Sequence, residues 1–327
     1  MEGEAVTTGS SAQVIPLHRT RDDEPRPASP REHDAPVVAF PGATAAPEQP
    51  GQGDPLTRFL TFLCHRLTGD YTVDEFGFDP ELTDTLVLPP VRVLYEKWFR
   101  VSTHGVRNLP AEGGALLVAN HSGVLPIDSV MTAFAVHEQR GRHLRMLGAD
   151  LVFKTPLLGT LARRSGQTLA CGPDAERLLR AGELVGVWPE GFKGVGKPFS
   201  ERYKLQRFGR GGFVSAALRT GVPIIPVSIV GAEEIYPKLA DLKPLARLLG
   251  LPYFPVTPFF PLLGPLGAIP LPTKWHIEFG EPIATDGLAA EADEDPLLIF
   301  NLNDQVREAI QQMLYRRLSQ RRGVFRD

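Results

Sequence analysis

Residues 115–134 read ALLVANHSGVLPIDSVMTAF, and this stretch decides the class of fold. The apolar run over 115–119 predicts a short buried strand, and the periodic apolar run that Asp128 opens predicts a helix. His121 stands directly after the strand, followed by a bend around Gly123. The stretch thus sets an imidazole and a carboxylate in a loop at the carboxyl end of a strand, the usual place of a site in α/β proteins.

The loop decides whether His121 and Asp128 can meet. On one straight helix, the seven steps between them would span about 10 Å along the axis. Contact therefore needs a bend, which Gly123 and Pro126 allow. In contact, Asp128 would orient His121 as a general base that takes a proton from a hydroxyl. The alternative is that His121 is an ordinary loop histidine and Asp128 a helix cap.

Strands and helices alternate on both sides of this loop. Strands are expected near 99–102, 115–119, 145–148, 184–188, 224–230 and 276–279, and helices near 128–137, 156–164, 174–181, 212–220 and 295–317. Such alternation predicts an α/β fold, with a mixed, mainly parallel sheet flanked by helices.

Three parts are expected along the chain. Residues 1–53 hold eight prolines, four arginines and eight acidic residues with almost no aromatic side chain, which predicts a disordered tail without a secretory signal. Residues 54–98 predict a helical segment, with an amphipathic helix that Asp54 caps and a second helix over about 89–98. Residues 99–327 form the expected main domain.

Composition excludes several classes of protein. The 327 residues carry a net charge of −3, which argues against a dedicated nucleic-acid binder. Only Cys64 and Cys171 are present, so a reducing compartment is expected, with neither a disulfide framework nor structural zinc.

A charge-free stretch over 248–273 is long enough to cross a bilayer, but its seven prolines exclude a membrane helix. It is either a buried irregular connection or a loop that dips into a membrane interface. In the second case the expected anchors are the aromatic residues Tyr253, Phe254, Phe259 and Phe260.

Residues 184–212 read LVGVWPEGFKGVGKPFSERYKLQRFGRGG. After this strand and Glu190, the eighteen positions from Lys193 to Arg210 hold six basic residues against one acid, which suits a phosphate-bearing ligand. Residues 191–197 also match the spacing of a nucleotide-binding P-loop, but Pro198 stands where a magnesium-binding Ser or Thr is needed, which excludes that function. Further on, Pro226 interrupts an apolar strand, which marks a sheet edge, a bulge or the approach of a ligand.

The blocks NHSGVLPID, WPEGFKG and VPIIPV, in this order and over about 99–281, resemble those of the PlsC-like glycerolipid acyltransferases. The resemblance implies transfer of a fatty acyl group from acyl-CoA or acyl-carrier protein to a hydroxyl of a lysophospholipid or glycerolipid, by a peripheral enzyme on the cytoplasmic side of the membrane. It implies His121 as the base with Asp128 as its partner, no cofactor and no metal. The implied substrate-binding residues are Asn120, Ser122, Glu190, Gly191, Lys193 and Lys197.

Two departures from the family pattern keep other functions open. Six residues separate His121 from Asp128, where the family has four, and Gly172 stands where the family has an arginine for the acceptor phosphate. The acceptor is therefore not expected to be a simple glycerol phosphate. The alternatives are a thioesterase or hydrolase that uses the same base on water, and a catalytically silent lipid-binding protein on the same fold.

Overall fold

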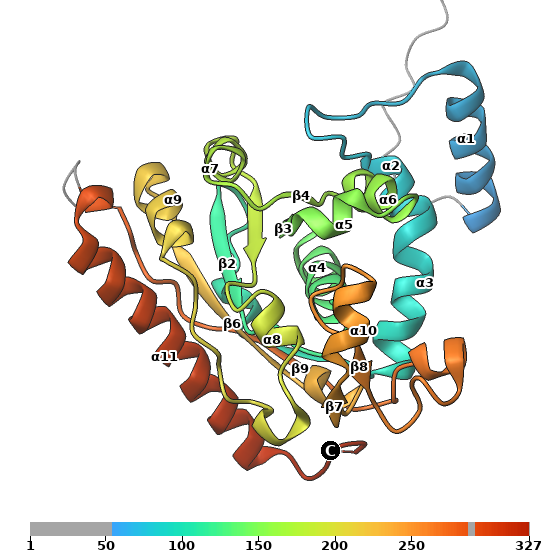
Figure 1. The fold of residues 1–327 in the computed structure, drawn as a ribbon. Coiled ribbons are helices and arrows are strands. Elements are labelled where there is room, and N and C mark those ends of the chain that lie inside the picture. Colours follow the sequence, from blue (N-terminus) through green and yellow to red (C-terminus); the bar gives the residue numbers. More distant parts are fainter. Residues whose placement is uncertain (1–53, 287–291, 327) are drawn as a thin grey trace, which may run out of the picture. The chain divides into compact units, whose positions relative to one another are not determined.

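The structure is a computed structural model that describes residues 54–286 and 292–326 (Figure 1). The tail expected over 1–53 lies outside the described residues. Within the described part, no helix combines the length and the apolar character that a membrane span requires.

A seven-stranded sheet forms the centre, and its class confirms the prediction from sequence. Its spatial order is β1 (Ser102–His104), β9 (His276–Phe279), β6 (Ile224–Val230), β2 (Ala115–Ala119), β5 (Leu184–Val187), β3 (Leu144–Gly148) and β4 (Thr168–Leu169). All neighbouring strands run parallel except β6 and β9. A separate antiparallel pair joins β7 (Ala240–Asp241) and β8 (Pro255–Val256).

Helices cover both faces of the sheet. They are α1 (Pro55–Thr68), α2 (Pro80–Leu82), α3 (Leu88–Val93), α4 (Ile127–Arg140), α5 (Asp150–Lys154), α6 (Leu158–Arg164), α7 (Gly172–Arg180), α8 (Phe192–Val195), α9 (Gly212–Thr220), α10 (Lys243–Leu248) and α11 (Pro296–Gln320). A π-helical turn at Thr83–Val87 joins α2 to α3, and a second at Leu94–Trp98 extends α3, so that 80–98 form one helical run. In Figure 1, α7, α9 and α11 lie on one side of the sheet and α3 and α4 on the other.

Alternation along β2 explains this arrangement. Leu117 and Ala119 belong to the same buried cluster as Met131 and Phe134 of α4. Leu116 and Val118 belong to a second cluster with residues of α7, α9 and α11. Because successive strand residues face opposite sides, an apolar residue at every position requires helices on both faces.

Two expected boundaries are wrong for local reasons. The helix expected at 89 begins at Pro80, because the side chain of Asp79 caps it by accepting the N–H of Leu82. The strand expected over 99–102 begins only at Ser102. Phe99 instead closes the preceding helical turn and stacks on Trp275, with ring centroids 4.5 Å apart.

Pro226 lies in a central strand, so the expectation of a sheet edge is wrong. The N–H of Ile224 points to the β9 side, where it bonds Ile283. Pro226 faces the same side, where its carbonyl oxygen accepts the N–H of Gly280, just beyond β9. The bond that a proline cannot donate is therefore on this side, and the strand keeps its ladder with β2.

The charge-free tract over 248–273 is largely exposed, which is the opposite of a buried connection. Leu248 and Leu262 are more than four-fifths exposed, and Leu266 is two-thirds exposed. Of the four expected aromatic anchors, only Phe259 is exposed, at 41%, whereas Tyr253 packs inward. Its leucines, rather than its aromatic rings, form the apolar surface.

Candidate active site

His121 and Asp128 meet in the loop that follows β2. His121 Nδ1 lies 2.8 Å from Asp128 Oδ2, and the Asp128 side chain is wholly buried. The same oxygen accepts the N–H of Ser122, and Oδ1 accepts the N–H of Ser129. With three donors satisfied, Asp128 is held as an acceptor, which places the proton of neutral His121 on Nδ1 and leaves Nε2 as the basic nitrogen.

A reversed turn brings the two side chains together. Gly123 has φ +91° and Val124 has φ +58°, a region that branched side chains avoid. The N–H of Val124 bonds Val195 O, and the hydroxyl of Tyr253 donates to Val124 O. The charge-free tract thus supports the turn that follows His121. This contact between distant segments was not predicted from the sequence.

Glu190 fixes the backbone of His121 from the next strand. Because β2 and β5 are parallel neighbours, their carboxyl ends lie side by side. Glu190 Oε1 accepts the N–H of His121 at 2.9 Å, and Oε2 accepts the N–H of Gln206 at 2.6 Å. The Glu190 side chain is buried, so both of its oxygens bond to groups inside the protein rather than to solvent.

Lys197 is also internal rather than presented to solvent. Its Nζ lies 3.5 Å from Glu190 Oε2 and 3.1 Å from Glu233 Oε1, and it donates to Lys204 O. Glu233 follows β6, which is the other parallel neighbour of β2. This charge cluster of Lys197, Glu190 and Glu233 ties the carboxyl ends of β5 and β6 together beneath the dyad loop.

Glu233 carries the clearest electrostatic signature in the cluster. Burial raises its pKa to about 7, although the charge of Lys197 opposes that shift. Sequence reasoning missed this residue. The available signal was its position three residues after a buried strand, at the sheet edge where the other site residues gather.

Stability should depend on pH through Glu233. A carboxyl whose pKa is raised on folding stabilises the fold fully below its unfolded pKa and loses that contribution as the pH rises through 7. Relative to Glu233→Gln, the wild type should therefore lose about 2–3 kcal/mol of unfolding free energy between pH 5 and pH 8. Urea unfolding at both pH values measures this, and parallel curves for the two proteins would contradict it.

The remaining predicted site residues divide by exposure. Asn120 is buried and forms two hydrogen bonds with β6. Its side-chain amide donates to Ile229 O and accepts the N–H of Ile229. Ser122 is buried beside Asp128. Gly191 and Lys193 are exposed, and Lys193 lies in the short helix α8.

Gly194 allows α8 to reach the histidine. A Cβ on Gly194 would stand 2.7 Å from His121 O and 2.9 Å from His121 Cβ, so a larger residue would push the two segments apart. Two exposed apolar side chains flank the site, Leu125 on the dyad loop and Phe192 at the start of α8. The imidazole of His121, the ammonium of Lys193 and the apolar side chains of Leu125 and Phe192 thus lie at the same edge of the sheet.

Comparison with known proteins relates the segment that carries this site to a protein family. The family profile described as Acyltransferase matches residues 100–230, which contain the dyad and the block around Glu190. Uncharacterized proteins of Mycobacterium tuberculosis and Mycobacterium leprae are each 59% identical over 266 residues, or 81% of this chain and 74% and 72% of theirs.

More distant similarity extends to animals. A human protein named DGAT1/2-independent enzyme synthesizing storage lipids is 26% identical over 58% of this chain, which spans about half (55%) of that protein's length. Among solved structures, the 1-acyl-sn-glycerophosphate acyltransferase PlsC of Thermotoga maritima aligns with a TM-score of 0.49 and 19% identity, over 82% of this chain and 96% of that one.

Proposed function

The chain belongs to the PlsC-like acyltransferase family, and from this premise we propose that it transfers a fatty acyl group from acyl-CoA or acyl-carrier protein to a hydroxyl of a lipid acceptor at a membrane surface. The contact between His121 and Asp128 carries the proposal, because it supplies an oriented base. Relatedness to an enzyme named for storage-lipid synthesis supports a lipid acceptor.

His121 acts on the acceptor hydroxyl in this mechanism. Nε2 takes the hydroxyl proton while the oxygen attacks the thioester carbonyl carbon, and Asp128 stabilises the imidazolium that forms. Backbone N–H groups of the strand-end loops stabilise the oxyanion. The carbon–sulfur bond then breaks, and the thiolate leaves with the proton from His121. The chemistry balances without a cofactor or a covalent enzyme intermediate.

The acceptor headgroup is assigned to the exposed basic residues of the loop after β5. Lys193 and Arg202 are exposed there, whereas the ammonium of Lys197 is engaged by two buried carboxylates. Lys193 and Arg202 can therefore meet a phosphate, while Glu190 and Lys197 act by holding the loop that carries His121.

Two exposed apolar surfaces support action at a membrane. One face of α1 presents Leu56, Phe59, Leu60, Leu63 and Leu67 to solvent. The charge-free tract presents Leu262, Leu263 and Leu266. Exposed leucines in such numbers favour burial in the headgroup region of a bilayer.

Charging the tract should release the protein from membranes. The double substitution Leu262→Asp and Leu266→Asp removes two apolar anchors, so binding to phosphatidylglycerol-containing vesicles should fall at least about tenfold. Co-sedimentation measures the partition. Leu297→Asp with Phe300→Asp is the matched control, because these two apolar residues of α11 are also more than half exposed. Equal losses in both variants would contradict a specific membrane face.

Acyl transfer itself is tested with the purified full chain, long-chain acyl-CoA or acyl-carrier protein, and a panel of lysolipids and acylglycerols. Formation of an acylated lipid, dependent on the acceptor, is the expected result. Release of free fatty acid at the same rate without any acceptor would instead identify a hydrolase. Vesicle binding with no turnover of any donor and acceptor would identify a silent lipid-binding protein.

A further inference from the structure

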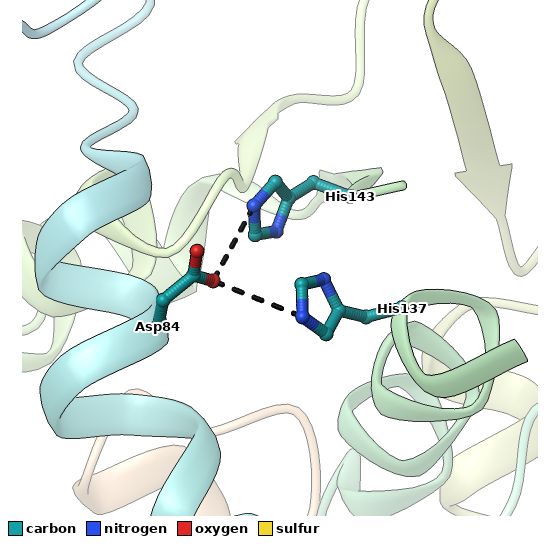
Figure 2. A group of neighbouring side chains, drawn as sticks. All are labelled: Asp84, His137 and His143. Carbon is teal, nitrogen blue, oxygen red and sulfur yellow. Dashed lines mark ion pairs between the residues drawn. The ribbon is translucent and has the colours of Figure 1, made fainter. Parts of the chain in front are cut away.

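A second group of side chains that could bind a ligand lies away from the dyad and consists of Asp84, His137 and His143 (Figure 2). Asp84 lies in the π-helical turn Thr83–Val87, His137 in the last turn of α4, and His143 directly before β3. α4 begins beside Asp128, and nine residues of helix rise about 14 Å. This histidine–aspartate cluster therefore lies at the far end of α4 from the active site.

The three side chains converge on a common point. His143 Nε2 lies 3.4 Å from Asp84 Oδ1, and His137 Nε2 lies 4.0 Å from the same oxygen. Figure 2 shows both rings turning this nitrogen toward the carboxylate. All three donor atoms lie within 4.8 Å of one another. Ligands of a tetrahedral ion with bonds of about 2.0–2.1 Å stand roughly 3.4 Å apart, so small side-chain shifts would complete the geometry.

Both imidazoles are largely buried, with side-chain exposures of 24% for His137 and 22% for His143. Within the described residues, the buried Nδ1 of His137 has no hydrogen-bond partner. Two cations also face the cluster, Arg58 and Arg145, and Arg145 is paired with Asp74 at 2.7 Å.

We propose that Asp84, His137 and His143 bind one divalent transition-metal ion of the zinc class. Two imidazole nitrogens and one carboxylate oxygen suit such an ion and disfavour Mg²⁺ and Ca²⁺, which prefer oxygen ligands. The half-exposed side of Asp84 leaves room for water as a fourth ligand. The ion clamps the helical run over 80–98 to α4 and β3. Cysteine counting could not detect a site of this composition.

Metal binding is tested on the full chain, tag-free and treated with chelator, by calorimetric titration with ZnCl₂ and by thermal unfolding. We expect one equivalent to bind and to raise Tm by several degrees, while MgCl₂ leaves it unchanged. The double variant His137→Gln with His143→Gln should bind at least about a hundredfold more weakly, since it loses two of three ligands.

Control variants separate this cluster from other histidines. His65→Gln is the matched control, because its Nδ1 also pairs with a carboxylate, Glu81, at 2.7 Å, and it should bind Zn²⁺ as the wild type does. The double variant His18→Gln with His33→Gln should also bind Zn²⁺ as the wild type does. Binding that survives the double variant but disappears in His121→Ala would place the ion at the dyad and overturn the proposal.

Visible absorption with Co²⁺ gives a reading that requires no variant. One equivalent added to the wild type should produce d–d bands of nitrogen and oxygen coordination, and Zn²⁺ should abolish them. A wild-type spectrum identical to that of aqueous Co²⁺ would overturn the proposal even if the double variant failed to fold. Acyl transfer is expected to survive chelation, so the two proposals can fail separately.

Discussion

Replacing His121 with alanine should lower the kcat of acyl transfer by about a thousandfold, within the range that a general base contributes. In the proposed mechanism the imidazole contacts the reacting hydroxyl rather than the acyl chain or the headgroup, so KM should change little. Release of CoA from long-chain acyl-CoA in the presence of a lysolipid measures both parameters. The fold should persist, because the side chain is partly exposed and, among the residues that the structure describes, it bonds only Asp128.

His65→Ala is the control for this experiment, because it removes another imidazole paired with a carboxylate while leaving the dyad intact. It should retain wild-type turnover. Equal acyl transfer by wild type and His121→Ala would remove His121 from the mechanism, however well the geometry suits it.

Asp128→Asn should lower kcat by a similar factor of about 10²–10⁴. The carboxylate accepts three N–H groups, from His121, Ser122 and Ser129. An asparagine offers one acceptor oxygen and a donating amide, so at least one of these donors meets another donor. The histidine then loses its orientation and its tautomer, and unfolding free energy should fall by about 1–3 kcal/mol.

Thr132→Val is the control that distinguishes loss of the Asp128 carboxylate from a general loss of stability around Asp128. Thr132 Oγ1 donates to the main-chain oxygen of Asp128 and lies in the same buried turn, but it does not touch the carboxylate. This variant should be destabilised yet keep most of its kcat. If it loses activity as fully as Asp128→Asn at a temperature where circular dichroism shows both folded, the effect is structural and the role of Asp128 as a partner of the base is wrong.

The sequence predicted those parts of the molecule that depend on local pattern. The alternation of strands and helices predicted the sheet class, and the position of His121 after β2 predicted where it would lie. The bounds of α9, β6 and β9 agree with expectation because each has a regular local pattern, which is helical spacing in α9, a nearly continuous apolar run in β6 and alternation in β9.

Parts that depend on contacts between distant segments could not be predicted. Lys197 belongs by composition to a solvated basic loop, yet Glu233 approaches it only because β6 and β5 flank β2. Tyr253 supports the dyad turn from a tract that composition alone assigned to either the core or a membrane. Nothing within either local stretch reveals its partner.

The strand order also has a consequence for the order in which the chain folds. β1 pairs in the described sheet only with β9, and Ser102 is in register with His276. During synthesis, β2, β5 and β6 can associate while β1 is still unpaired. Its partner β9 is made more than a hundred residues after β1. Because distant pairings form slowly, closing this side of the sheet is expected to be a late step. A chain that stops short of His276 would leave both β1 and one side of β6 open to pairing with another molecule.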